Sequence, residues 1–140
     1  MSLTILRYEE EGWRDVTLPV DPALQKMVDG FYERPGGCLL VAYDAETEAK
    51  VVGMGGFVRA SGEVCEVRNV VVYWGYQGKG VGKALMERLA GEARARGYRG
   101  MRVEVPESVP ALVGFFERTG FVRSAAEMQR GGFVRFERGL

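Results

Sequence analysis

The chain has 140 residues, and its 19 lysines and arginines balance its 19 aspartates and glutamates. This balance, without a basic run, argues against nucleic acid as the main partner, and no apolar run approaches the roughly 20 residues of a membrane-spanning helix. The sequence contains no histidine, which excludes histidine-based triads and histidine-ligated metals, and we expect no metal cofactor. A chain of this length is expected to fold as one domain, residues 1–140.

Both the N-terminus and the cysteines favour a cytoplasmic protein. The first residues show no charged region followed by an apolar stretch, so no signal peptide is visible. Cys38 and Cys65 each lie in an apolar run and lack the spacing of metal ligands. They are therefore expected to be reduced thiols in the core.

The N-terminal part is predicted to contain a strand, a helix and a second strand. Residues 3–8 form a short apolar run that suits a first strand. Asp21 before Pro22 suits a helix cap followed by the first helical position, and apolar residues at helical spacing continue to Phe31. Residues 38–43 have the length and composition of a buried strand.

A β-hairpin is predicted next, with strands at residues 50–60 and 63–72 joined by a turn at Ser61-Gly62. The first of these strands contains Gly53, Gly55 and Gly56. Glycine inside a strand indicates either close approach of a neighbouring element or a β-bulge. The sequence leaves both explanations open.

A strand, a glycine-rich loop and a helix follow one another between residues 66 and 97. The helix is predicted at residues 81–96 because Val81, Leu85, Leu89 and Ala93 recur every four residues. Gly97 suits the residue that ends it. Glycines leave backbone N–H groups uncovered, and a helix N-terminus carries partial positive charge. This arrangement predicts a seat for an anion, most often a phosphate.

The spacing of the glycines distinguishes between kinds of phosphate loop. A Walker A loop requires Ser or Thr after Gly82-Lys83, but Ala84 stands there, and neither glycine pair has the third glycine of a dinucleotide fingerprint. Gln77, Gly80 and Gly82 instead meet the pattern Gln/Arg-x-x-Gly-x-Gly/Ala. A nucleotide-binding protein remains the weaker alternative.

The C-terminal part is predicted to contain a strand at residues 101–105, a short helix at 111–118 and two final strands at 121–125 and 132–137. Strands and helices therefore alternate along the chain. This order predicts an α/β layered domain on a mixed sheet.

The loop motif, the strand before it and the downstream segment Phe-Glu-Arg-Thr-Gly-Phe at 116–121 resemble the GNAT superfamily of acyl-CoA-dependent N-acyltransferases. The resemblance extends over roughly residues 38–123. It implies a single GNAT-like domain with a mixed, mostly antiparallel sheet of about seven strands, splayed central strands and helices on both faces.

The resemblance also implies acetyl-CoA, or another acyl-CoA, as co-substrate. Main-chain groups of Val70 and Val72 would pair with the pantetheine arm, and an amide near Val71 or Val72 would polarise the thioester carbonyl. The amides of residues 77–83 would bind the pyrophosphate. Lys79 and Lys83 either add positive charge there or are solvated surface lysines. The expected coenzyme-binding residues are Val70, Val71, Val72, Gln77, Gly78, Lys79, Gly80, Val81, Gly82 and Lys83.

Glu66 corresponds to a position that often serves as general base in the family, directly or through water. The alternative is a surface ion pair between Glu66 and Arg68, and Glu104 is a second candidate base. Two positions depart from the family pattern: Val109 replaces a frequent asparagine, and Phe116 replaces a frequent tyrosine that protonates the leaving thiolate. Phe116 has no proton to give, so the general acid is left open.

The expected reaction is direct transfer of an acetyl group to a primary amine of a small molecule or peptide in a ternary complex. Acceptor pockets in the family form near positions that correspond here to residues 31–35 and 128–132. The alternative function is an acyl-CoA-binding sensor with weak catalysis. A homodimer is a further possibility.

Overall fold

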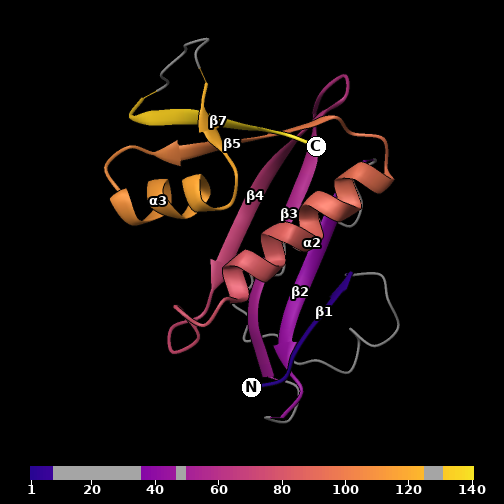
Figure 1. Ribbon diagram of the computed structural model, residues 1–140, viewed down its shortest axis with the longest axis vertical. Helices are drawn as coiled ribbons and strands as arrows, with labels where there is room; N and C mark the ends of the chain where they lie inside the picture. Colours follow the sequence, from indigo (N-terminus) through magenta and orange to yellow (C-terminus); the bar gives the residue numbers. More distant parts are fainter. Residues whose placement is uncertain (8–35, 47–49, 125–130) are drawn as a thin grey trace.

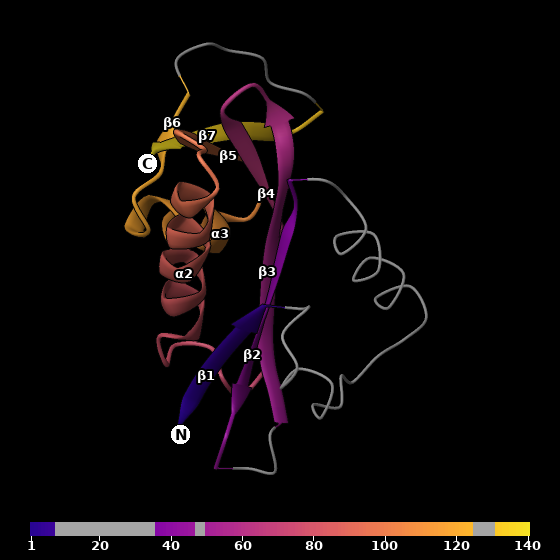
Figure 2. The same ribbon diagram turned by 90° about the vertical axis from the view of Figure 1, so that its right-hand side faces the viewer.

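A seven-stranded sheet forms the centre of the molecule, and its strand order is β1-β2-β3-β4-β5-β7-β6. The computed structural model describes residues 1–7, 36–46, 50–124 and 131–140 (Figures 1 and 2). All neighbouring strands are antiparallel except β4 and β5, which are parallel. The mixed, mostly antiparallel sheet predicted from the sequence is therefore confirmed. Its strands are β1 (Leu3–Arg7), β2 (Cys38–Asp44), β3 (Lys50–Ser61), β4 (Val64–Val72), β5 (Gly100–Pro106), β6 (Val122–Arg123) and β7 (Phe133–Gly139).

Two helices, α2 (Val81–Ala95) and α3 (Pro110–Arg118), lie on one face of the sheet (Figure 2). Both were predicted within a residue of these bounds. Val81, Leu85, Leu89 and Ala93 are all buried in the core beneath α2, where a large apolar side chain stabilises the fold by about 1.5 to 3 kcal/mol. The helix predicted at residues 22–31, which would cover the other face, lies outside the described residues.

The glycines of β3 lie where the neighbouring strand β4 approaches closely and where, in the ladder between the two strands, β4 and not β3 contains a bulge. A Cβ atom on Gly53 would lie 2.8 Å from the main-chain oxygen of Val71, so the neighbouring strand approaches closely there. Met54 pairs with Val71 and Gly56 pairs with Arg68. An advance of two residues along β3 therefore corresponds to three residues along β4. The extra residue lies in β4 beside Asn69, whose φ of 57° is the only positive value of a non-glycine residue in the described ranges. The bulge therefore belongs to the partner strand and bends β4.

The central strands β4 and β5 pair only at one end. Their register runs from Val64–Gly100 to Glu66–Arg102 and then stops, whereas β5 pairs with β7 along its whole length. Figure 1 shows the two strands diverging beyond this point. The predicted splay of the central strands is thus confirmed, and it opens a gap on the edge of β4.

The two cysteines are buried free thiols, as predicted. The thiol of Cys65 contacts the carbonyl oxygen of Gly100 at 3.7 Å. Burial raises the pKa of Cys65 to about 12, so this thiol stays protonated near neutral pH. Neither described helix has the length and apolar character that crossing a lipid bilayer demands.

The last two strands differ slightly from prediction. β6 is only two residues long, and β7 extends to Gly139, past the predicted end at residue 137. Ser124 still donates its N–H to the carbonyl oxygen of Arg135, so the chain leaves the ladder just after β6. Residues 125–130 lie outside the described part.

Candidate active site

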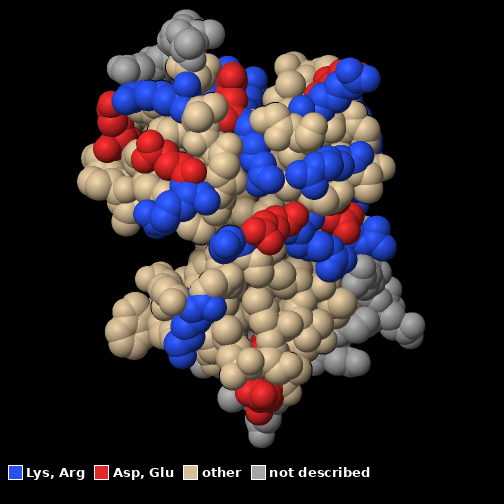
Figure 3. All heavy atoms as spheres, viewed as in Figure 1, with Lys and Arg blue, Asp and Glu red and all other residues tan. Residues whose placement is uncertain are grey.

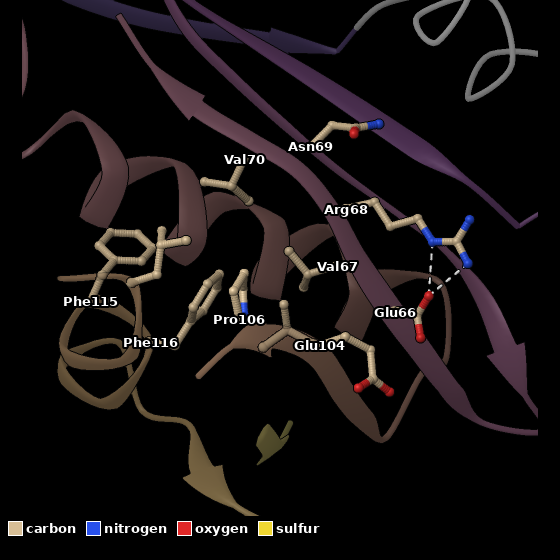
Figure 4. Close-up of a pocket in the computed structure, with 11 residues that line it drawn as sticks. Glu66, Val67, Arg68, Asn69, Val70, Glu104, Pro106, Phe115 and Phe116 are labelled. Carbon is tan, nitrogen blue, oxygen red and sulfur yellow. Dashed lines mark hydrogen bonds and ion pairs between the residues drawn. The ribbon is translucent and has the colours of Figure 1, made fainter. Parts of the chain in front are cut away.

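A cavity of about 330 Å³ lies where β4 and β5 separate (Figure 4). Phe115 and Phe116 of α3 lie at one end of it, and the carboxylates of Glu66 and Glu104 lie at the other. The remaining residues around it are Val67, Arg68, Asn69, Val70, Val103, Pro106 and Leu112. One end of the cavity is therefore apolar and the other is charged.

The predicted anion seat lies between the end of β4 and the start of α2. Gly80 occupies the N-cap position with a φ of 84°, no side chain of the described residues caps the helix, and the first turn of the helix contains no acidic residue. The first hydrogen bond of the helix runs from the N–H of Ala84 to the carbonyl oxygen of Gly80. The N–H groups of residues 81–83 therefore have no acceptor within the helix. These groups and the helix dipole together attract negative charge.

The loop before α2 is exposed and carries basic residues. Figure 3 shows no acidic side chain beside this loop on that face, and the surface is notched between the loop and the part that contains α3. Lys79 lies over the ring of Tyr76, with its Nζ 5.7 Å from the ring centre, and Lys83 is exposed on the first turn of α2. The loop is therefore open to solvent on the side where an anion would approach.

Contacts at both ends of the loop hold it against the gap between β4 and β5. The side-chain amide of Gln77 donates to the carbonyl oxygen of Val72 at 3.1 Å. Gly82 lies so close to α3 that a Cβ atom there would be 2.7 Å from Cε1 of Phe115. The gap, the loop and the start of α2 therefore form one continuous region.

The main chain of β4 alternates between β3 and the gap. Tyr73 donates its N–H to Val52 of β3, and the oxygen of Val71 faces Gly53 of β3. Because the N–H and C=O of one strand residue point to the same side and neighbours alternate, the main-chain groups of Val72 face the gap. Of the two predicted positions for the polarising amide, Val72 therefore has the suitable orientation and Val71 does not.

Glu66 is buried, with 8% of its surface exposed, and it contacts two arginines. Its Oε2 accepts from Nε of Arg68 at 2.8 Å and contacts Nη2 at 2.7 Å, and its Oε1 accepts from Nε of Arg102 at 3.2 Å. Burial acts to raise the pKa of Glu66, but the hydrogen bonds and charges of Arg68 and Arg102 outweigh it and lower the pKa below its ordinary value. The carboxylate is therefore ionised at neutral pH.

The ion pair with Arg68 was anticipated, but the role of Arg102 was missed. Arg102 lies opposite Glu66 in the short parallel ladder between β4 and β5, a register that spacing along the sequence does not reveal. Glu104 has a similar partner, since both Nε and Nη2 of Arg135 on β7 lie 2.9 Å from its Oε1. The two candidate bases thus both accept hydrogen bonds from arginines.

The aromatic end contains no proton donor in the place of the family tyrosine. Phe116 is buried, and its ring packs edge-on against Phe115 at 5.1 Å and Phe121 at 5.4 Å between ring centres. Val109 forms the N-cap of α3 and is partly exposed. The hydroxyl of Tyr73, at the end of β4, is buried and has no hydrogen-bond partner among the described residues, and burial raises the pKa of Tyr73.

The acceptor segments proposed from the sequence fall mostly outside the described residues: all of 31–35 and residues 128–130. Gly131 and Gly132 begin the turn into β7, and the carbonyl of Gly132 accepts from the N–H of Glu107. Within the described ranges, no three Cys, Asp or Glu residues gather as a metal site would require.

Comparisons with known proteins identify the family. A glucosamine 6-phosphate N-acetyltransferase of rice (Oryza sativa subsp. japonica) is 33% identical over 96 residues, which are 64% of this chain and 56% of the rice protein. This chain thus aligns with little more than half of that relative's length.

Solved structures share the fold. A GNAT acetyltransferase of Staphylococcus aureus Mu50 superimposes with a TM-score of 0.76 at 14% identity, covering 99% of both chains. A Bacillus subtilis acetyltransferase in complex with CoA gives a TM-score of 0.73 at 22% identity, again over 99% of both chains. The family model described as the acetyltransferase (GNAT) family matches residues 5–121. The chain belongs to this family.

Proposed function

We propose that the protein is an acyl-CoA-dependent N-acyltransferase that transfers an acetyl group from acetyl-CoA to a primary amine of a small molecule or peptide by direct attack. The observation that carries this proposal is that free helix N-terminal amides, an exposed glycine loop and the open edge of β4 form one continuous region. Two similar proteins support it: the B. subtilis acetyltransferase structure contains CoA, and the rice protein is an N-acetyltransferase.

The loop and the first turn of α2 would bind the pyrophosphate of the coenzyme. The N–H groups of residues 77–83 supply donors at fixed positions, and Lys79 and Lys83 add positive charge. A Cβ atom on Gly75, Gly78 or Gly80 would meet no other atom within 4 Å. The loop is therefore wide enough for a bulky phosphate to approach its main chain.

The edge of β4 would hold the pantetheine arm and orient the thioester. Val70 and Val72 lie along the gap, and Val72 presents its main chain to it. An amide hydrogen bond to the thioester oxygen would stabilise the negative charge that develops during attack. Fixing both reactants in one cavity supplies most of the remaining rate enhancement, because a thioester is already activated.

Proton transfer would involve Glu66, with Glu104 as the second candidate. Glu66 is ionised and lies at the charged end of the cavity, so it can accept, directly or through water, the proton that the acceptor ammonium loses before its nitrogen attacks. Its lowered pKa makes it a weaker base than an isolated glutamate. Phe116 has no hydroxyl, so the thiolate would leave unprotonated, take its proton from water or use another donor.

Thiol release from acetyl-CoA across a panel of primary amines tests the proposal. We expect at least one amine to raise thiol release well above hydrolysis without amine. Thermal shift measurements with coenzyme A and ATP run in parallel, since a ligand that binds the folded state raises the melting temperature. Stabilisation by coenzyme A without amine-dependent release would instead support the sensor alternative, and stabilisation by ATP alone would support a nucleotide-binding protein.

A further inference from the structure

We propose that Arg68 and Arg102 form a subsite for an anionic group on the acceptor, so that the preferred substrates are amines that also carry a carboxylate or a phosphate. The inference rests on the proposed function, because it specifies which amine the N-acyltransferase accepts. It concerns the charged end of the cavity between β4 and β5.

The two arginines project from the sheet face opposite α2 and α3. Cys65, Val67, Met101 and Val103 belong to the core cluster that packs beneath the helices. Side chains alternate between the two faces of a strand, so Glu66 and Arg68 on β4 and Arg102 on β5 point to the other face. Figure 4 shows Arg68 bonded to Glu66 there.

Both guanidinium groups keep unused donors after binding Glu66. Arg68 uses its Nε and Nη2 on one carboxylate oxygen, and Arg102 uses only its Nε on the other. A guanidinium carries more N–H donors than these contacts employ. In the described part of the chain, no other acceptor contacts either group. The Arg68 side chain is 49% exposed and that of Arg102 is 25% exposed, so the remaining donors are partly accessible.

The nearby carboxylates are already engaged. Glu66 accepts from both arginines, and Glu104 accepts from Arg135 at 2.9 Å. Glu137 lies opposite Arg102 on β7, but it is exposed and its carboxylate accepts from the hydroxyl of Ser124 at 3.3 Å. Among the described residues, the unfilled groups are therefore N–H donors of Arg68, which lines the cavity, and of Arg102, which lies beside it across Glu66, and they call for an anionic acceptor. Guanidinium groups bind carboxylate and phosphate through paired, charge-assisted hydrogen bonds.

The spacing suits a small molecule. Arg68 and Val72 are four residues apart on β4, which is roughly 13 Å for an extended strand and less across the bulge. The amine must approach the thioester on the Val72 side, while its anionic group would reach Arg68. Glu66 holds both guanidiniums in place and so positions this subsite, while a proton from an amine on the Val72 side would reach its carboxylate through water.

Matched acceptor pairs test the subsite. One pair is an amino acid and its amide, and the other is an amino sugar phosphate and the same sugar without phosphate. In one of the two pairs we expect kcat/KM to be at least tenfold higher for the member that carries the anionic group, mainly through a lower KM. The pair that shows this difference identifies the preferred anion as carboxylate or phosphate. In Arg68→Gln this ratio should fall toward one, and Arg68→Lys should retain part of it. Arg94→Gln, an exposed arginine in the last turn of α2, should leave the ratio unchanged.

A binding measurement keeps the subsite testable if turnover is absent. Calorimetric titration of the same pairs into protein saturated with coenzyme A should show at least tenfold tighter binding of a charged member, lost in Arg68→Gln. Equal binding and equal kcat/KM within both pairs would overturn the subsite while leaving the acyltransferase proposal intact. Charge-dependent binding without thiol release from any amine would refute the proposed activity and retain the subsite.

Discussion

The two ends of the candidate site are built from different parts of the polypeptide. The end formed by the loop and the start of α2 presents main-chain N–H groups, and its side chains are mostly small or point to solvent. The end formed by Glu66, Arg68 and Arg102 presents side chains from two strands. A main-chain site depends on backbone conformation, whereas a side-chain site depends on which residues face each other across the sheet. Substitutions should therefore affect the two ends in different ways.

The largest effect is expected from placing a negative charge in the main-chain end. Gly80→Asp sets a carboxylate at the helix N-cap, where two like charges about 4 Å apart repel by about 4 kcal/mol at an intermediate effective dielectric. We expect coenzyme A affinity to fall at least about a hundredfold in calorimetric titration. Gly80→Asn is the matched control, since asparagine has nearly the same shape, tolerates the positive φ and also caps helices. Equal losses in both variants would show that charge at this position does not matter.

A smaller effect is expected from the two glycines of α2. Gly82→Ala would place its Cβ 2.7 Å from Phe115, and the resulting overpacking should lower the free energy of unfolding by about 2 to 3 kcal/mol. Gly91→Ala meets no atom within 4 Å and should raise it by about 1 kcal/mol, because alanine favours the helix. Denaturant unfolding of both variants measures the contrast. Two changes of the same sign would contradict the close contact between α2 and α3.

At the side-chain end, Glu66→Gln should cost about 2 kcal/mol of stability near pH 7, because two charge-assisted hydrogen bonds are weakened. The pKa of Glu66 in the folded protein lies below its ordinary value of 4.5. Ionised Glu66 therefore stabilises the fold above pH 4.5, and this contribution disappears as the pH falls through the lower, folded-state pKa. The difference between wild type and variant should shrink accordingly in unfolding measured from pH 7 to pH 3.

Glu63→Gln provides the control for this pH dependence. Glu63 forms an exposed ion pair with Arg99 at 3.4 Å, and such pairs contribute about 0 to 1 kcal/mol. Its substitution should change stability little at any pH. If Glu66→Gln behaves like Glu63→Gln, the buried pairing of Glu66 is not stabilising. The turnover rate of Glu66→Gln tests whether Glu66 is the general base. A rate and pH profile equal to those of wild type would show that it is not.

The smallest effect is expected from hydroxyl groups. Tyr73→Phe removes a buried hydroxyl that no described residue hydrogen-bonds, and it should raise stability by about 1 kcal/mol. Tyr98→Phe removes a hydroxyl that donates to the carbonyl of Gly36 at 2.8 Å, so it should lower stability by a similar amount. Thermal unfolding of the pair gives the comparison. A loss of stability in Tyr73→Phe would reveal an unrecognised partner, and a loss of turnover would identify Tyr73 as a proton donor.

The main-chain end was largely predictable from the sequence because its signals are local. Gln77, Gly80 and Gly82 are close together in the chain, and the four-residue period of α2 follows directly. Glycine positions report backbone conformation without knowledge of the fold. The splayed strands, by contrast, were expected only from the resemblance to a family.

The side-chain end was less predictable because it depends on register. Glu66 and Arg102 are 36 residues apart, and Glu104 and Arg135 are 31 apart. Nothing in the local pattern of β4 indicates which residue of β5 will face it. The bulge at Asn69 was also missed, because the run of valines around it reads as a regular strand and asparagine is only a weak signal of positive φ.

The short ladder between β4 and β5 also has a mechanical consequence. In the described part of the chain, the ladder that joins strands β1 to β4 to the group of β5, β7 and β6 has three residue pairs. A ladder this short should resist rotation of one group of strands against the other less than the longer ladders β2–β3, β3–β4 and β5–β7 resist bending. A small rotation about this ladder would move the open end of the gap between β4 and β5 much more than the closed end at Glu66. The geometry around Glu66 could then stay fixed while the open end adapts to a bound ligand.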